Sequence, residues 1–259
     1  MTKEELIEKL EYYTNPDFSF NERYHRYTYR NENFISVTTF LQKFHRPFDF
    51  KYWVEKKAEE DGVTVAEKSA EWKELNDRAN VIGSATHNWI ENYYNGVLQE
   101  IPTDLDVVDR INKFNLIYAE KLHKLIPVKF EQKLFSKKLK IAGMIDSLFL
   151  WNGKVIILDW KTNKEFTSDK HPKGKFEELL HPFDSFYKNH HNEYSIQISL
   201  YAYILREIGI EVAGMYLVYI GPDTVDENGN IIKRPAELHR VKDMRSELDL
   251  YFKGDIFAI

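Results

Sequence analysis

Two kinds of hydrophobic pattern divide the chain near Pro127. Before this residue, apolar positions recur every three or four residues, which is typical of amphipathic helices; after it, they alternate or run together, as in strands. The pattern predicts a mostly helical N-terminal part (residues 1–127) and an α/β core (residues 128–259). No linker rich in Gly or Ser separates the two parts, so we expect one domain over residues 1–259.

The N-terminal part is predicted to hold a charged helix at the start, a hairpin over residues 24–29 and 34–36, and a short helix after Ser36. Two longer helices follow. The second opens with a capping box formed by Thr64 and Glu67 and stops at Asn95–Gly96. Another helix is expected from residue 104 to 125.

The second part begins with three predicted strands, over residues 128–136, 140–151 and 154–160. A charged loop over 163–191 leads into a helix over 193–209 that is apolar nearly all round and is therefore expected to be buried. A strand over 212–221, a turn over 227–230, a strand over 236–243 and a last helix complete the chain. This order predicts an α/β fold with a central mixed sheet flanked by helices.

The turn at Asn152–Gly153 fixes the register of two strands, because Asn-Gly supplies the positive φ angles of a type I′ turn. Counting outward from it places Asp146 directly opposite Asp159. Like charges in that position destabilise a sheet. A hard divalent cation such as Mg²⁺ or Mn²⁺, which takes oxygen ligands, would remove the repulsion. Lys161 lies two residues beyond Asp159 and so shares its face.

A third acid, Glu131, lies on the preceding strand. A two- or four-residue connection pairs Phe135 with Lys140 and Glu131 with Met144, which leaves Glu131 diagonal to Asp146 on the same face. A three-residue loop would instead turn Glu131 to the opposite face.

A simpler interpretation is that Asp146 and Asp159 are strand-end acids in solvent and that Lys161 is their surface partner. The residues that lead up to the acids are apolar on both faces, however, which indicates strands that are buried on both sides. Charged residues at the ends of such strands are more typical of a cleft.

Composition narrows the possible classes of protein. With 259 residues, 43% of them hydrophobic, the chain can bury a large core. It has no apolar run long enough for a membrane span, and its charged N-terminal helix is unlike a signal peptide, so we expect a cytoplasmic protein of a bacterial or phage-infected cell. The absence of Cys excludes disulfides, thiolate zinc sites and a cysteine-ligated iron-sulfur cluster. The net charge of -5 argues against indiscriminate coating of nucleic acid, although a local basic channel remains compatible with it.

Five sequence elements, in this order and spacing, resemble the RecB-type branch of the PD-(D/E)XK nuclease superfamily. They are Gly83-x-x-x-His87, Glu131, Gly143-Met144-Ile145-Asp146, Asp159-Trp160-Lys161-Thr162 and Gln197-x-x-x-Tyr201. A looser similarity, through residues 35–39 and the long helices before Gly83, points toward the mitochondrial genome maintenance exonuclease and related phage exonucleases. The resemblance implies a restriction-endonuclease-like core.

The same resemblance implies a metal-dependent phosphodiesterase. Its ligands for Mg²⁺ or Mn²⁺ would be Asp146, Asp159, the Trp160 carbonyl and His87, with Glu131 as a supporting acid. Lys161 would orient or deprotonate the attacking water. Gln197 and Tyr201 are four residues apart on one helix and would point together at the site. On the residues alone, Gln197 could equally bond a neighbouring carbonyl, and His87 could form a helix-surface pair with Glu91.

The activity that the resemblance implies is a DNA exonuclease, with single-stranded or free ends as the substrate by analogy. A duplex-end recombination nuclease is one alternative, and a non-hydrolytic DNA-binding protein that retains the fold is another. The chain has no GxxxxGK[ST] phosphate loop, so it is expected to act without a helicase motor of its own. Relatives with a four-cysteine iron-sulfur cluster are disfavoured, and no residue pattern identifies a protein partner.

Two groups of residues could contact DNA. Lysines that could follow a phosphate backbone are Lys133, Lys137, Lys138, Lys140, Lys161, Lys164, Lys170, Lys173 and Lys175. Aromatic residues that could stack on unpaired bases are Phe44, Phe48, Phe50, Tyr52 and Trp53.

Overall fold

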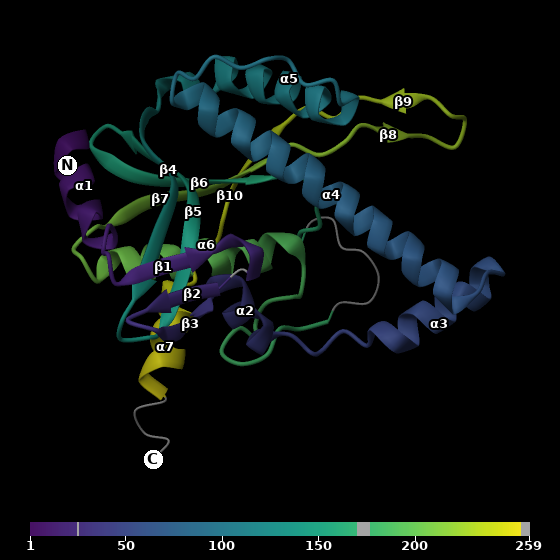
Figure 1. Ribbon diagram of the computed structural model, residues 1–259, viewed down its shortest axis with the longest axis horizontal. Helices are drawn as coiled ribbons and strands as arrows, with labels where there is room; N and C mark the ends of the chain where they lie inside the picture. Colours follow the sequence, from purple (N-terminus) through teal and green to yellow (C-terminus); the bar gives the residue numbers. More distant parts are fainter. Residues whose placement is uncertain (25, 170–176, 255–259) are drawn as a thin grey trace.

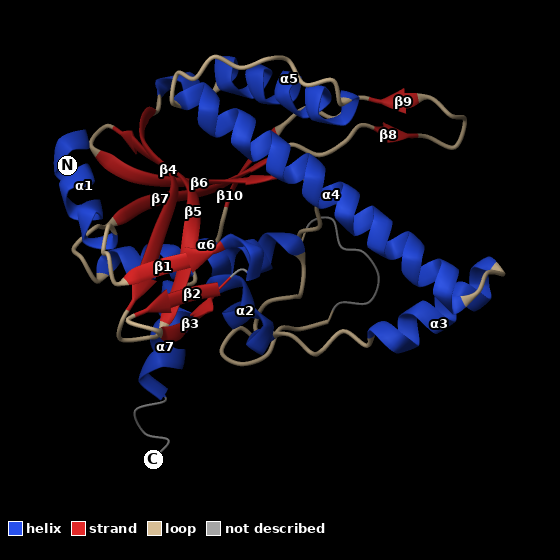
Figure 2. Ribbon diagram, viewed as in Figure 1, coloured by secondary structure: helices blue, strands red, loops and turns tan. Residues whose placement is uncertain are grey.

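A mixed sheet with helices on both faces forms the centre of the protein in the computed structural model, which describes residues 1–24, 26–169 and 177–254 (Figures 1 and 2). The strands are β1 (Phe18–Asn21), β2 (Arg26–Tyr29), β3 (Glu32–Ser36), β4 (Ile126–Ser136), β5 (Ile141–Trp151), β6 (Lys154–Lys161), β7 (Val212–Tyr219), β8 (Thr224–Val225), β9 (Ile231–Ile232) and β10 (Glu237–Arg240). The α-helices are α1 (Lys3–Leu10), α2 (Val37–Leu41), α3 (Phe50–Asp61), α4 (Val65–Tyr94), α5 (Leu105–Glu120), α6 (His190–Arg206) and α7 (Arg245–Gly254). Short 3₁₀ turns are η1 (Glu11–Tyr13), η2 (Glu22–Tyr24), η3 (Gln42–Phe44) and η4 (Leu122–Lys124).

The central strand β5 has two neighbours on one edge, and this arrangement creates a fork. Strand β4 pairs along nearly the whole of β5, whose other edge pairs with β3 at Ile141 and Ala142 and with β6 from Ser147 onward. The two partners β3 and β6 therefore diverge beside residues 143–146. Strand β7 continues the sheet parallel to β6, and β10 closes it.

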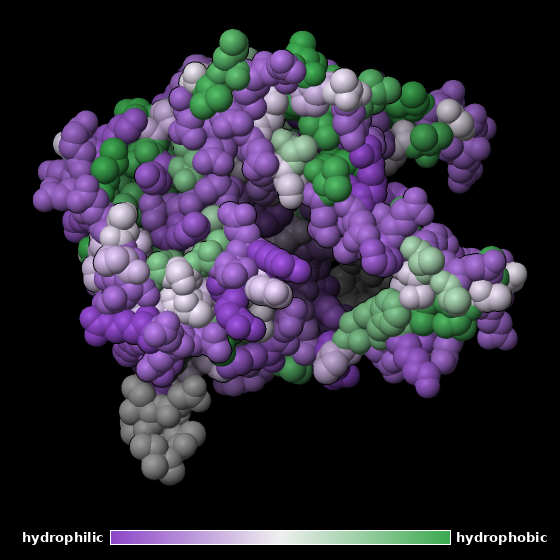
Figure 3. Space-filling model, viewed as in Figure 1, coloured by the Kyte–Doolittle hydropathy of each residue, from purple (hydrophilic) through white to green (hydrophobic). Residues whose placement is uncertain are grey.

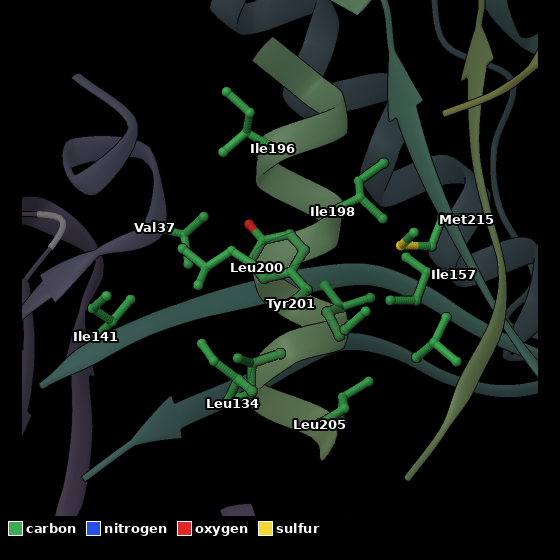
Figure 4. Close-up of a cluster of buried hydrophobic side chains, with 14 of the residues drawn as sticks. Val37, Leu134, Ile141, Ile157, Ile196, Ile198, Leu200, Tyr201, Leu205 and Met215 are labelled. Atoms are coloured by element: carbon green, nitrogen blue, oxygen red, sulfur yellow. The ribbon is translucent and has the colours of Figure 1, made fainter. Parts of the chain in front are cut away.

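Each face of the sheet packs against its own helices. Leu148 and Ile157 face α6, as Figure 4 shows for Ile157, whereas Phe149 and Trp160 face α4 and α5. The central strands are thus buried on both sides, as the continuous apolar runs predicted. Burial of this kind is the main stabilising contribution to such a sheet, at about 25 cal/mol per Å² of apolar surface removed from water.

Most predicted elements are confirmed. Helix α4 begins with the predicted capping box, in which the Thr64 hydroxyl accepts from the Glu67 N–H and the Glu67 carboxylate accepts from the Thr64 N–H. The predicted hairpin is β2–β3, and the turn near residues 227–230 joins β8 to β9.

Other boundaries are different. The helix expected over 104–125 ends at Glu120, followed by η4, and the helix expected over 193–209 already begins at His190, where the Asn189 side chain caps it. The N-terminal part also contributes β1, β2 and β3 to the central sheet, so both parts of the chain share one sheet.

The predicted register of β4 against β5 is wrong by two residues. Phe135 pairs with Ala142, not Lys140, and Lys133 rather than Glu131 is opposite Met144. The reason is the connection, which runs from residue 137 to 140 because Lys140 adopts a positive φ of 53° and belongs to the turn. Since the shift is even, Glu131 keeps the predicted face but lies opposite Asp146 instead of diagonal to it.

In the part of the chain that the structure describes, no helix has the length and apolar character needed to cross a membrane.

Candidate active site

An open cleft of about 810 Å³ lies between α4 and the fork in the sheet. Its walls come from α4, the middles of β4 and β5, the end of β6 and the start of α6. Figure 3 shows the molecule hollowed on this side, between its main body and the arm formed by α3 and the first half of α4. The charged side chains that line the cleft are Glu22, Glu91, Glu131, Asp146, Lys133 and Lys161, together with His87.

The β5–β6 hairpin has the register that its turn predicted. Asn152 and Gly153 both have positive φ, and Leu148 pairs with Ile157. Regular pairing ends one step before the two acids, so Asp146 and Asp159 begin the divergence of the strands. There the Asp146 Oδ2 accepts a hydrogen bond of 2.9 Å from the Trp160 N–H, which holds the carboxylate across the fork.

Helix α4 carries His87 to this fork. The helix can approach β6 closely because residue 83 is glycine, where a Cβ would lie 3.2 Å from the Thr162 Oγ1. The His87 Nε2 is 3.0 Å from the Trp160 carbonyl oxygen. Because a carbonyl oxygen only accepts, Nε2 is the donor in this contact, and Nδ1 on the other side of the ring lies 3.6 Å from Asp146 Oδ2.

Glu131 completes a group of three possible ligands. Donor atoms of His87, Glu131 and Asp146 all lie within 4.8 Å of one another. Glu131 has a positive φ of 46°, which is rare for a residue other than glycine and interrupts the pairing of β4 at that position. Burial, together with the charges of Asp146, Glu91 and Asp159, raises the pKa of Glu131 to about 8.

Lys161 is held by three neighbours. Its Nζ is 2.6 Å from Asp159 Oδ2, donates to Gln197 Oε1 at 3.4 Å, and lies 4.4 Å from the centroid of the Tyr194 ring. Burial alone would lower the pKa of Lys161, but the attraction to Asp159 and Asp146 outweighs it and the pKa is raised. The side chain is therefore a fixed cation that can donate hydrogen bonds into the cleft.

A hydrogen-bond relay connects Lys161 to the interior of α6. The Gln197 carbonyl oxygen accepts from Lys161, and its amide nitrogen donates to the Tyr201 hydroxyl at 3.0 Å. Tyr201 is buried and passes close to Gly143, where a Cβ would be 2.7 Å from the tyrosine ring. Figure 4 shows Tyr201 beside Val37 in this packed region. Gln197 thus bonds side chains rather than a neighbouring carbonyl.

The structure divides the predicted site residues into two groups. Asp159, with only 1% of its surface exposed, pairs with Lys161 and is not one of the three clustered donors, whereas Glu131, expected only as a supporting acid, is one of them. The Trp160 carbonyl accepts from His87. Its role as a metal ligand therefore stays a prediction.

Tyr194 and Glu91 also line the cleft, although neither was assigned to the site from the sequence. Tyr194 precedes Gln197 by three positions, so the spacing of Tyr194, Gln197 and Tyr201 along α6 already placed them on one face. Glu91 follows His87 by four positions and was interpreted as half of a surface pair, but it lines the cleft and its charge acts on Glu131.

The residues proposed to bind DNA have different environments. Lys133 lines the cleft, whereas Lys137 packs on the Tyr29 ring and Lys140 pairs with Glu32. Lys170, Lys173 and Lys175 lie outside the described residues. Of the aromatic set, Phe44 is buried and the prediction of a stacking role for it is wrong, while Phe48, Phe50, Tyr52 and Trp53 are exposed.

The chemistry of this donor set fits a hard divalent cation. Two carboxylates and one imidazole nitrogen converge, and burial together with the nearby acids raises the pKa of Glu131, so a cation there would stabilise its ionised form. Mn²⁺ and Mg²⁺ accept such oxygen-rich sites, and Mn²⁺ also tolerates the imidazole. His87, Glu131 and Asp146 could hold the ion.

Comparison with known proteins identifies a family for most of the chain. The family model described as "PD-(D/E)XK nuclease superfamily" matches residues 41–250. No curated protein matches the chain. A solved structure titled "Crystal structure of SSO0001" aligns with 97% of this chain and 83% of its own at 15% identity, with a TM-score of 0.31, which is too low to support an inference.

Proposed function

Because the chain belongs to the PD-(D/E)XK nuclease superfamily, we propose that it is a DNA exonuclease that requires Mg²⁺ or Mn²⁺ and prefers single-stranded ends. The observation that carries this proposal is the convergence of His87, Glu131 and Asp146 within 4.8 Å beside the ion pair of Lys161 and Asp159. The superfamily consists of metal-dependent nucleases; DNA as the substrate, the requirement for an end and the preference for single strands are parts of our proposal.

In the proposed mechanism the cleft residues have separate tasks. His87, Glu131 and Asp146 would hold the ion, and a bound ion would supply polarisation of the scissile phosphate and a water of lowered pKa. Lys161 donates hydrogen bonds to the attacking water and to the phosphate oxygen that gains charge. Asp159 and Gln197 fix the direction of the Lys161 ammonium group, so little reorganisation is needed when charge develops.

The preference for single strands is supported by exposed aromatic residues on and just before α3. Phe48 and Tyr52 expose 62% and 52% of their surfaces at the start of α3, and Lys56 lies over the Tyr52 ring. Exposed rings beside a cation favour stacking with unpaired bases, which a duplex does not offer. This observation favours the exonuclease over the duplex-end recombination nuclease. A DNA-binding protein without hydrolytic activity is the alternative from another class. The buried pair of Lys161 and Asp159 argues against it, because burying two charges costs free energy and DNA binding alone does not require such a pair.

Cleavage of labelled linear single-stranded DNA, linear duplex DNA and circular single-stranded DNA tests the proposal. With Mg²⁺ or Mn²⁺ we expect rapid degradation of the linear single strand, slower degradation of the duplex, an intact circle, and no cleavage with EDTA. Lys161→Ala and Asp159→Asn should each lower the rate by at least about 100-fold while circular dichroism still shows a folded protein.

Two variants outside the cleft serve as controls. Lys154→Ala alters an exposed lysine at the other end of β6, and Asp77→Ala alters an exposed acid on α4. Both should cleave at the rate of the unmodified protein. If Lys161→Ala and Asp159→Asn also retain that rate, the assigned site is wrong; if the circle is cut as fast as the linear strand, the requirement for an end is wrong.

A further inference from the structure

A second pocket lies over Ile156 and Leu158 of β6, on the face of the sheet that packs against α4 and α5. It has a volume of about 240 Å³ and is walled by η4, the β5–β6 hairpin, β7 and β10. We call it the η4 pocket. None of the described residues lines both the η4 pocket and the cleft, so a molecule in the η4 pocket would leave the cleft open.

The floor and rim of the η4 pocket are apolar. Leu158 and Tyr216 belong to the floor, where the second hydrophobic core reaches the surface. Trp151 lines the pocket with 50% of its surface exposed, and the neighbouring Ile126 exposes 51%. Exposed tryptophan beside an open apolar pocket is more typical of a docking site than of ordinary protein surface.

The charges around this pocket have one sign. Lys121 and Lys124 line it, no acid does so in the described part of the chain, and Lys154 is the cross-strand partner of Trp151. Lys121 is paired only with the exposed Glu120, at 3.4 Å, and no ion pair of Lys124 occurs among the described residues. In a chain of net charge -5 such a local excess of cations favours an acidic ligand.

Size decides what kind of acidic ligand fits. Sites for drug-sized molecules have about 300–1,000 Å³. The η4 pocket is smaller and suits one large side chain, such as Phe or Leu, whose neighbours remain outside. We propose that the η4 pocket binds a peptide segment of a partner protein, with one apolar side chain inserted against Leu158 and Tyr216 and adjacent carboxylates facing Lys121 and Lys124.

Binding of this kind would hold the protein on a partner without occupying the cleft. The inserted side chain provides a buried anchor, and the flanking carboxylates provide charge complementarity, the two features that dominate small peptide interfaces. This inference does not depend on the proposed exonuclease activity.

Fluorescence anisotropy with two labelled peptides tests the inference. The probes are GSDEDF, with a free carboxyl terminus, and GSKRKF, with the charges reversed. We expect the unmodified protein to bind GSDEDF at least about 10-fold more tightly. The double variant Lys121→Glu/Lys124→Glu should reverse this order. Trp151→Ser should weaken the binding of GSDEDF to the otherwise unmodified protein and of GSKRKF to the double variant. Lys3→Glu, on α1, is the matched control and should bind as the unmodified protein does, and DNA cleavage by the double variant should be unchanged.

Three results would overturn the inference. Equal binding of the two peptides would remove the argument from charge, and an unchanged preference in the double variant would place binding elsewhere. Displacement of GSDEDF by dodecanoate or by an oligonucleotide at lower concentration than by unlabelled GSDEDF would identify the η4 pocket as a site for lipid or DNA instead.

Discussion

Glu131 lies where an ionised carboxylate is costly, and this cost makes stability depend on pH. Its pKa is raised to about 8 by burial and by the neighbouring acids, from an ordinary value of 4.5. A folded-state pKa above the unfolded value favours folding when the acid is protonated, so this contribution is complete below pH 4.5 and is lost as pH rises toward 8. In EDTA we therefore expect the melting temperature to fall by several degrees between pH 5 and pH 8.5.

The variant Glu131→Gln isolates that contribution, because it stays neutral at every pH. Its melting temperature in EDTA should exceed that of the unmodified protein at pH 8.5 and match it near pH 5. Mn²⁺ should raise the melting temperature of the unmodified protein and have less effect on the variant, since a ligand has been lost. If the melting temperatures of the two proteins depend on pH in the same way, the loss of stability at high pH does not come from the Glu131 carboxyl group.

Tyr194 is predicted to position Lys161 through its ring rather than its hydroxyl group. The ring centroid lies 4.4 Å from the ammonium nitrogen, and such a contact contributes about 0.5–2 kcal/mol. Tyr194→Phe should keep kcat within about threefold, whereas Tyr194→Leu should lower kcat about 10-fold with little change in KM. If Phe is as harmful as Leu, the hydroxyl group is the important part of the side chain.

At the scale of elements, a single glycine allows β5, α2 and α6 to meet. A Cβ at residue 143 would lie 2.7 Å from the Tyr201 ring and 2.9 Å from Val37 Cγ2, so Gly143→Ala must displace both. We expect a loss of about 1–3 kcal/mol in the free energy of unfolding and reduced cleavage, because Tyr201 supports Gln197. Urea denaturation measures the first effect.

The control for this variant is Gly254→Ala, where an added Cβ meets nothing within 4 Å. It should leave unfolding and cleavage unchanged. Adding Val37→Ala to Gly143→Ala should restore part of the stability by removing one of the two clashes. A Gly143→Ala protein as stable as the unmodified one would show that the packed region repacks freely.

The elements also show what could be predicted from the sequence. The β5–β6 register was predictable because Asn152 and Gly153 have chemistry that selects one turn. The β4–β5 register was not, because nothing in the composition of residues 137–140 indicates that Lys140 adopts a positive φ. Strand β1 has only four residues, too few for a pattern of alternation to stand out.

At the scale of the whole molecule, the candidate site combines residues that are far apart in the chain. His87 comes from α4 and Lys161 from β6, and the motif predicted both, but the contact between His87 and the Trp160 carbonyl depends on how α4 crosses the sheet (Figure 1). The order of the donors, with Glu131 in the close group and Asp159 beside Lys161, depends on the positive φ of Glu131, which local sequence patterns do not encode.

The arm formed by α3 and α4 leads to the last prediction, which concerns substrate binding. Figure 3 shows apolar surface on this arm, and Phe48, just before α3, and Tyr52, on α3, are exposed aromatic residues. Stacking contributes about 1–3 kcal/mol per base, so Phe48→Ala/Tyr52→Ala should weaken binding of a linear single strand about 10- to 100-fold and leave duplex binding nearly unchanged. Anisotropy in an Asp159→Asn background measures binding without cleavage.

The control for this variant is Leu98→Ala, which alters a fully exposed leucine after α4 and should have no effect on binding. An equal loss for single-stranded and duplex DNA would mean that the arm contacts the backbone, and the preference for unpaired bases would then need another source.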